Sequence, residues 1–223
     1  MLVHGGYHDS SCWRLLLPHI EKPSVAVDLP GRGSRPLTGE APTLADYAAA
    51  VREEADAAGF ERFALVGHSM GGLTISRTAA DLPGRVACLI YVGALTPPPG
   101  VTVAELFGVD IPRGSPDLQP LVAEDHARAL FGNDMSDDLW AVARESLVPE
   151  PSAAFHFTVD EQPRGIPTTY VQMTDDVPVP PALAAELIPQ LGPGVDVRTI
   201  EAGHNVMLSQ PEVLAAIVND AAR

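Results

Sequence analysis

One short stretch constrains the fold more than any other, an apolar run from Phe63 to Val66 that leads directly into Gly-His-Ser-Met-Gly at residues 67–71. Such a run is typical of a buried strand, and residues 71 to about 80 have a helical pattern. The G-x-S-x-G spacing then predicts a sharp strand-to-helix turn with the Ser69 hydroxyl exposed. Glycine is expected at 67 and 71 because side chains there would collide as the backbone folds back. The alternative is a turn that only caps a helix, so the rest of the chain has to decide.

The remaining sequence alternates between apolar strand-like runs and helical patterns. Helices are predicted over 10–20, 43–58 (with Thr43 as N-cap), 180–191 and 211–222, and strands over 2–3, 24–29, 86–92, 166–173 and 195–200. Together with the strand before Ser69 this gives about six strands. Their alternation with helices predicts the α/β class, with a doubly wound and mostly parallel sheet.

The pattern changes between residues 96 and 165. Three consecutive prolines at 97–99 exclude helix and central strand, and short helical patches follow over 124–130 and 137–147. Apolar Leu130, Phe131, Leu139 and Trp140 recur there at helical spacing, which favours a small helical cap over a long disordered loop. We therefore expect a core made of residues 1–95 and 166–223, with an inserted cap over 96–165.

Composition limits the classes of partner. The net charge is −15, from 29 acidic and 14 basic residues, which argues against nucleic acid and anionic membranes. The sequence contains no apolar stretch of transmembrane length and no visible signal peptide. Two cysteines, Cys12 and Cys88, are expected to be free thiols, which favours a cytoplasmic location. Neither has neighbours at metal-ligand spacing, so no metal and no cofactor are predicted, and a homodimer is left open.

Chemically informative residues follow four of the predicted strands. His4-Gly5-Gly6 follow the strand predicted over 2–3, and Ser69 follows the strand over 63–66. Asp175 and Asp176 follow the strand over 166–173, and His204 follows the strand over 195–200. Ligands bind at the carboxyl ends of strands in an open parallel sheet, so these residues are expected to converge. The chain order serine, aspartate, histidine is the one expected for such an architecture.

These residue types suit nucleophilic catalysis. A serine hydroxyl needs a base within hydrogen-bond reach, for which His204 is the candidate, and a carboxylate orients that imidazole. Asp176 is favoured because a turn and a helix start follow it, and Asp175 is the alternative. The backbone amides of Gly6 and Met70 are candidates for an oxyanion hole. His8 and Trp140 are candidates to line the substrate pocket, and the other histidines are expected to be structural.

With these residues in hand, the sequence resembles the α/β-hydrolase fold and, within it, the esterases related to plant methylesterases and hydroxynitrile lyases, including bacterial relatives that cleave carboxylic esters. The resemblance spans nearly the whole chain. It is carried by residues 2–6 with Trp13 downstream, by 67–72, by 173–176 with Val179-Pro180, and by 203–204 with 207–208 and 210–211. It implies that the acid is Asp176 and that the amides of Gly6 and Met70 form the oxyanion hole.

The same resemblance separates the candidate functions. Hydroxynitrile lyases of this family carry a lysine after the catalytic histidine and a hydroxylated residue near the oxyanion turn, whereas Asn205 and Gly6 stand here, which disfavours lyase activity. We therefore expect a serine hydrolase that cleaves a small-molecule carboxylic ester or thioester of a small, largely apolar acyl group. An acyltransferase of a biosynthetic pathway, using the same acyl-enzyme with an alcohol, amine or carrier-bound acceptor, is the alternative.

Overall fold

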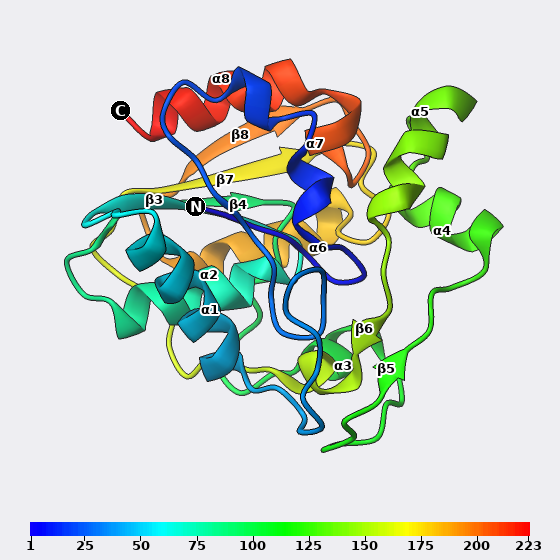
Figure 1. Cartoon of the computed structure of the whole chain (residues 1–223). Coiled ribbons are helices and arrows are strands. Elements are labelled where there is room, and N and C mark those ends of the chain that lie inside the picture. The colour runs from blue at the N-terminus through cyan, green and yellow to red at the C-terminus, as the bar shows by residue number, and fades with distance from the viewer.

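The computed structural model describes residues 1–223 and is built on one sheet of six parallel strands (Figure 1). In their order across the sheet the strands are β2 (Ala26–Val27), β1 (Leu2–Val3), β3 (Phe63–His68), β4 (Val86–Val92), β7 (Thr168–Met173) and β8 (Asp196–Ile200). The chain leaves β1 toward one edge and returns at β3 on its other side. The carboxyl ends of β1 and β3 therefore border the switch point at which such sheets bind ligands.

Two hydrophobic cores cover the two faces of this sheet. Successive strand residues point to opposite faces, so Val3 and Leu65 join one core while Leu2 and Val66 join the other. The first core packs beneath α1 (Leu44–Ala57), α2 (Gly71–Asp81) and α6 (Pro181–Leu187), and the second beneath α7 (Val206–Ser209) and α8 (Pro211–Ala221). This is the doubly wound arrangement predicted from the sequence.

The segment between β4 and β7 contributes no strand to the main sheet. Its elements are α3 (Val103–Phe107), β5 (Leu118–Gln119), α4 (Glu124–Phe131), α5 (Asp137–Ala143), η3 (Arg144–Ser146), β6 (Glu150–Pro151) and the 3-10 helix η4 (Ser152–His156). Strands β5 and β6 pair antiparallel with one another and were not anticipated, nor was α3. The helical patches predicted near 124–130 and 137–147 are α4 and α5 with η3, whereas the division into a core and a cap domain stays a prediction.

Three other predicted elements are shorter than expected. The helix predicted over 180–191 divides into α6 and a short 3-10 turn, η5 (Ile188–Leu191). Residues 10–20 form two 3-10 turns, η1 (Ser10–Trp13) and η2 (Leu17–His19). Pro18 has no N–H to continue an α-helix, so the apolar spacing there does not produce one. The strand predicted over 24–29 shrinks to β2, because β1 offers only two residues to pair with it, Leu2 and Val3.

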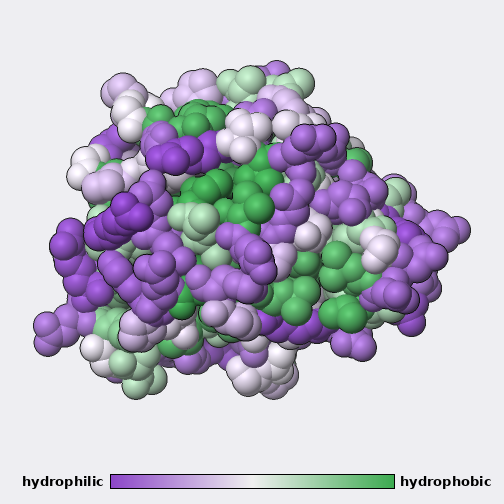
Figure 2. Space-filling view, turned by 90° about the horizontal axis from the view of Figure 1, so that it is seen from above, coloured by the Kyte–Doolittle hydropathy of each residue, from purple (hydrophilic) through white to green (hydrophobic).

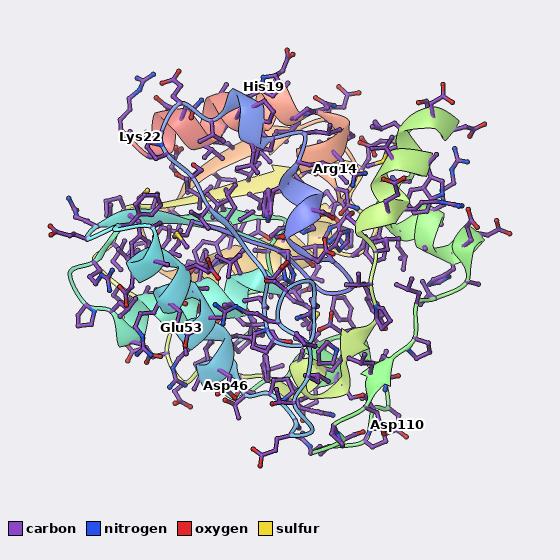
Figure 3. All side chains as sticks on the ribbon, viewed as in Figure 1. Arg14, His19, Lys22, Asp46, Glu53 and Asp110 are labelled. Carbon is purple, nitrogen blue, oxygen red and sulfur yellow. The ribbon has the colours of Figure 1, made fainter.

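The outer surface carries the excess of charge. Asp46 and Glu53 project from α1, and Asp46 also closes a capping box with Thr43, as predicted for that N-cap (Figure 3). Seen from the side of α8, hydrophilic residues cover most of the surface and apolar ones emerge between them (Figure 2). None of the helices combines the length and the apolar character that crossing a bilayer requires.

Candidate active site

Ser69 occupies a strained turn between β3 and α2. Its φ is 53°, in the left-handed region that residues other than glycine seldom adopt. Glycine is required on both sides, since a Cβ on Gly67 would lie 2.8 Å from the Gly71 carbonyl oxygen. A Cβ on Gly71 would lie 2.7 Å from the carbonyl oxygen of His4, in the segment after β1. The steric reason predicted for the two glycines is confirmed, and it also brings the turn against the end of β1.

The loops after β7 and β8 bring a carboxylate and an imidazole together. His204 Nδ1 lies 2.9 Å from Asp176 Oδ1 and 2.8 Å from Oδ2, and both side chains are buried. Asp176 Oδ1 also accepts a 2.7 Å hydrogen bond from the Val179 N–H, which fixes the carboxylate. Asp175 is exposed, and its carboxylate instead accepts a hydrogen bond from the Thr174 hydroxyl. The structure thus places Asp176, rather than Asp175, on His204.

Ser69 and His204 line one cavity of about 380 Å³. The loop that carries Asp176 fits behind His204 because Gly93, directly after β4, has no side chain. A Cβ there would lie 2.8 Å from Asp176 Oδ2, and its φ of 48° also favours glycine. Ser69 lines this cavity, and its hydroxyl forms no hydrogen bond within the protein.

The turn after β1 lies against Ser69 and is held by His4. A Cβ on Gly5 would come within 2.7 Å of the Ser69 Cβ. The Leu29 N–H donates to His4 Nε2 at 3.2 Å, so Nδ1 carries the proton and donates to the Gly5 carbonyl at 2.8 Å. That carbonyl belongs to the same peptide unit as the Gly6 N–H. Gly6 and Met70 both line the cavity beside Ser69, where their amides can face a developing oxyanion.

Comparison with known proteins agrees with this architecture. The sequence model of the "Alpha/beta hydrolase family" matches residues 1–217. The chain belongs to this family. Pyrethroid hydrolase of Sphingobium wenxiniae is 27% identical, over 99% of this chain and 86% of the relative. Methylesterase 7 of Arabidopsis thaliana is 28% identical, over 98% and 94%. The crystal structure of a pyrethroid hydrolase from Sphingobium faniae, 26% identical, superposes with a TM-score of 0.80 over 98% of this chain and 94% of that one.

Fold and relatives together identify the chain as a carboxylesterase-like hydrolase. The resemblance to methylesterase-related proteins that the motifs indicated is confirmed. Structures less similar in sequence share the fold, among them an extracellular α/β-hydrolase from a Paenibacillus species, with 18% identity and a TM-score of 0.82.

Neither predicted pocket residue of this hydrolase lines the cavity beside Ser69. His8 is fully buried, donates from Nδ1 to the Gly6 carbonyl at 2.7 Å, and accepts at Nε2 from Asn205 at 3.0 Å. Trp140 packs within the second core against Gly132. The prediction was wrong for both because each side chain turns into the protein interior, His8 behind the turn at Gly5 and Gly6 and Trp140 against Gly132.

Most residues that line the cavity were not predicted from the sequence to do so. They are mostly apolar and come from the cap and from the loops after β1, β4 and β7: Tyr7, Leu95, Val103, Phe107, Val109, His126, Leu130, Phe131, Phe155, Val177 and Pro178. His126, expected to be an ordinary helix residue, lies among them. No Asp, Glu, Lys or Arg contributes to the lining. Phe107 ends α3 and Val109 comes two residues later. The sequence did not predict this short helix because proline-rich segments flank it.

Three buried histidines surround the site without lining the cavity. Burial lowers the pKa of His4 and of His68 well below the ordinary value, and it lowers the pKa of His8 to about 4. His68 Nε2 lies 3.0 Å from the His204 carbonyl oxygen, so it supports the loop that carries His204. These imidazoles therefore act as neutral packing and hydrogen-bonding groups near pH 7.

The buried histidines predict a loss of stability in mild acid. Because the pKa of His8 is 6.5 in the unfolded chain and about 4 when folded, the unfolded state takes up a proton first as the pH falls. Stability from this group is complete above about pH 6.5 and is lost toward pH 4. Between pH 7.5 and 5 the unfolding free energy should fall by about 2 kcal/mol from His8 alone.

Urea unfolding at the two pH values measures this difference. In a His8→Gln variant the pH-dependent difference should shrink by about the same amount, whatever the variant's absolute stability. His19→Gln, which removes an exposed imidazole (Figure 3), is the matched control and should preserve the difference. Equal pH dependence in the wild type and in His8→Gln would contradict a neutral, buried His8.

Proposed function

We propose that this hydrolase cleaves carboxylic esters or thioesters through a Ser69–His204–Asp176 triad and a covalent acyl-enzyme. Ser69 Oγ attacks the carbonyl carbon while His204 Nε2 takes its proton, and the protonated imidazole then gives that proton to the leaving alcohol or thiol. In the second half, water loses a proton to His204 and attacks the acyl carbon, and Ser69 Oγ leaves with that proton as the carboxylic acid is released. The Gly6 and Met70 amides stabilise the oxyanion in both steps.

The contact between His204 Nδ1 and the Asp176 carboxylate, in a cavity shared with Ser69, is the observation that carries this proposal. A carboxylate on Nδ1 keeps the proton there and leaves Nε2 free to act as a base. It also stabilises the imidazolium that forms when Ser69 is deprotonated. The strained left-handed backbone of Ser69 supports the same role, because such strain is retained where geometry serves function.

The substrate class follows from the cavity. Its apolar lining and its lack of ionisable side chains other than those of Tyr7, His126 and His204 favour a small, neutral, largely apolar acyl group. Two relatives are named for the hydrolysis of a pyrethroid and of a methyl ester, which supports an uncharged ester as the substrate. Asn205, whose amide donates to His8, offers no cation after His204 that could stabilise a departing cyanide, so lyase chemistry is not proposed.

Trapping the acyl-enzyme tests the proposal and separates hydrolysis from acyl transfer. A short p-nitrophenyl ester should give a burst of p-nitrophenol and a mass increase on the peptide containing Ser69. With a competing alcohol or amine present, hydrolysis predicts free acid as the main product. Predominant transfer to the added acceptor would make the protein an acyltransferase, and a label on any other residue would refute the serine mechanism.

A further inference from the structure

The residue after Gly6 is held in an unusual conformation. Tyr7 has a φ of 58°, and it and Ser69 are the two residues other than glycine with positive φ in the chain. Such a conformation costs on the order of 1–3 kcal/mol and persists only where its surroundings impose it. Gly6 itself has no side chain, so its backbone can rotate more freely than that of any other residue. Contacts to the neighbouring peptide units must therefore set the direction of the Gly6 N–H.

One of those contacts reaches the turn from the distant cap. The Tyr7 N–H donates to Glu150 Oε2 at 2.6 Å, across 143 positions of sequence, and the Tyr7 carbonyl accepts from the Val148 N–H at 2.9 Å. Leu147 forms an isolated bridge with His8, so residues 147–150 run alongside the turn. A Cβ on Gly6 would lie 3.3 Å from Glu150 Oε2, which places the carboxylate directly behind the oxyanion turn.

Glu150 is fully buried, and its second oxygen is paired with Arg32, which is itself 3% exposed. Arg32 also donates to the Tyr47 hydroxyl at 2.7 Å. Burial disfavours the charge on Arg32, but the Glu150 carboxylate and the Tyr47 hydroxyl together outweigh this and raise the pKa of the guanidinium. A buried ion pair is weak evidence for stability, because apolar residues of similar size often serve as well. Stability alone therefore does not explain why the Arg32–Glu150 ion pair is buried beside this turn.

We infer that Glu150 is a positioning residue of the active site, whose carboxylate, fixed by Arg32, holds the Tyr7 amide and thereby aims the Gly6 N–H at the oxyanion. This inference rests on the function proposed above. Arg32 holds the carboxylate in place through its ion pair, and a carboxylate binds a backbone N–H roughly twice as strongly as a neutral acceptor does. His8 holds the carbonyl of the same Gly6–Tyr7 peptide unit from the other side.

A pair of double variants isolates this role from simple stabilisation. Removing either charge alone would leave the other buried and unpaired, so both are removed together. Arg32→Met/Glu150→Gln keeps an acceptor for the Tyr7 N–H, and Arg32→Met/Glu150→Met removes it at similar volume. We expect kcat for p-nitrophenyl acetate to be about 10- to 100-fold lower in the second variant than in the first, with KM within about threefold.

An oxyanion-mimicking inhibitor provides the readout that a structural role would not change. A trifluoromethyl ketone forms a tetrahedral adduct with serine, so its affinity should fall between the two variants by about the same factor as kcat. Equal kcat and equal inhibitor affinity in both variants would overturn the inference. Should Arg32→Met/Glu150→Met not fold, Glu150→Asp decides, since its shortened carboxylate cannot reach both partners. A kcat within twofold of wild type in that variant would overturn the inference equally.

Fluorophosphonate labelling separates this failure from a failure of the proposed function. If Ser69 of the wild-type protein is labelled while the two double variants turn over equally fast, only the positioning role is wrong. If Ser69 is not labelled at all, the serine mechanism fails, and with it the reason for aiming the Gly6 N–H.

Discussion

Replacing Ser69 by alanine is expected to lower kcat/KM for short p-nitrophenyl esters by about 10⁴- to 10⁶-fold. In the proposed mechanism the change removes the atom that forms the acyl-enzyme, and the remaining activity would come from the Gly6 and Met70 amides and from binding in the cavity. The fold should survive, because alanine keeps the Cβ of serine and adds no new clash at φ 53°. Steady-state kinetics and thermal unfolding of the variant measure the two effects separately.

Ser209→Ala is the matched control for this experiment. Its hydroxyl has no hydrogen-bond partner and lies on α7, outside the cavity lining. The control should retain wild-type kinetics. Substantial esterase activity in Ser69→Ala would exclude Ser69 as the nucleophile and leave the strained turn without a catalytic purpose.

Asp176→Asn is expected to lower kcat by about 10⁴-fold with little change in fold. The Val179 N–H donates to Asp176 Oδ1, so an asparagine would keep its carbonyl oxygen at that position and turn its NH₂ toward His204 Nδ1. Two donors cannot share that contact. The imidazole must then carry its proton on Nε2, where it can no longer accept one from Ser69.

Asp175→Asn provides the contrast, since the two aspartates are adjacent in sequence. The Asp175 side chain is exposed and contacts Thr174, so its replacement should change kcat by less than about threefold. Steady-state kinetics on both variants between pH 6 and 9 checks the assignment. A large loss in Asp175→Asn, with Asp176→Asn nearly normal, would reverse it.

The strand ends explain why so much of the site could be predicted. Side chains just past a parallel strand meet at one edge of the sheet, whatever their separation in sequence. Ser69, Asp176 and His204 each follow a strand that the sequence predicts, so their convergence required only that those strands pair in parallel, as they do. The choice of Asp176 over Asp175 also agrees with its sequence context, the turn that ends at Val179.

The errors share a different cause. His8 and Trp140 were expected at the cavity from their position along the chain, yet both turn into the interior. The direction of a side chain in a loop or a short helix depends on what it packs against, and sequence periodicity carries little of that information. The buried partners of Glu150 were missed for the same reason, because Tyr7, Arg32 and Glu150 lie in segments with no periodic pattern linking them.

The sequence by itself determined the order of strands and helices, the strained turn at Ser69 and the chemical type of residue at each strand end. These properties follow from local sterics and from the period of apolar residues, which act over a few neighbouring positions. Only the tertiary structure decided the length of β2, the apolar residues that line the cavity, and the contact of the cap carboxylate Glu150 with the turn after β1. Those depend on close packing between segments that are separated in sequence, where each side chain settles according to its neighbours in space.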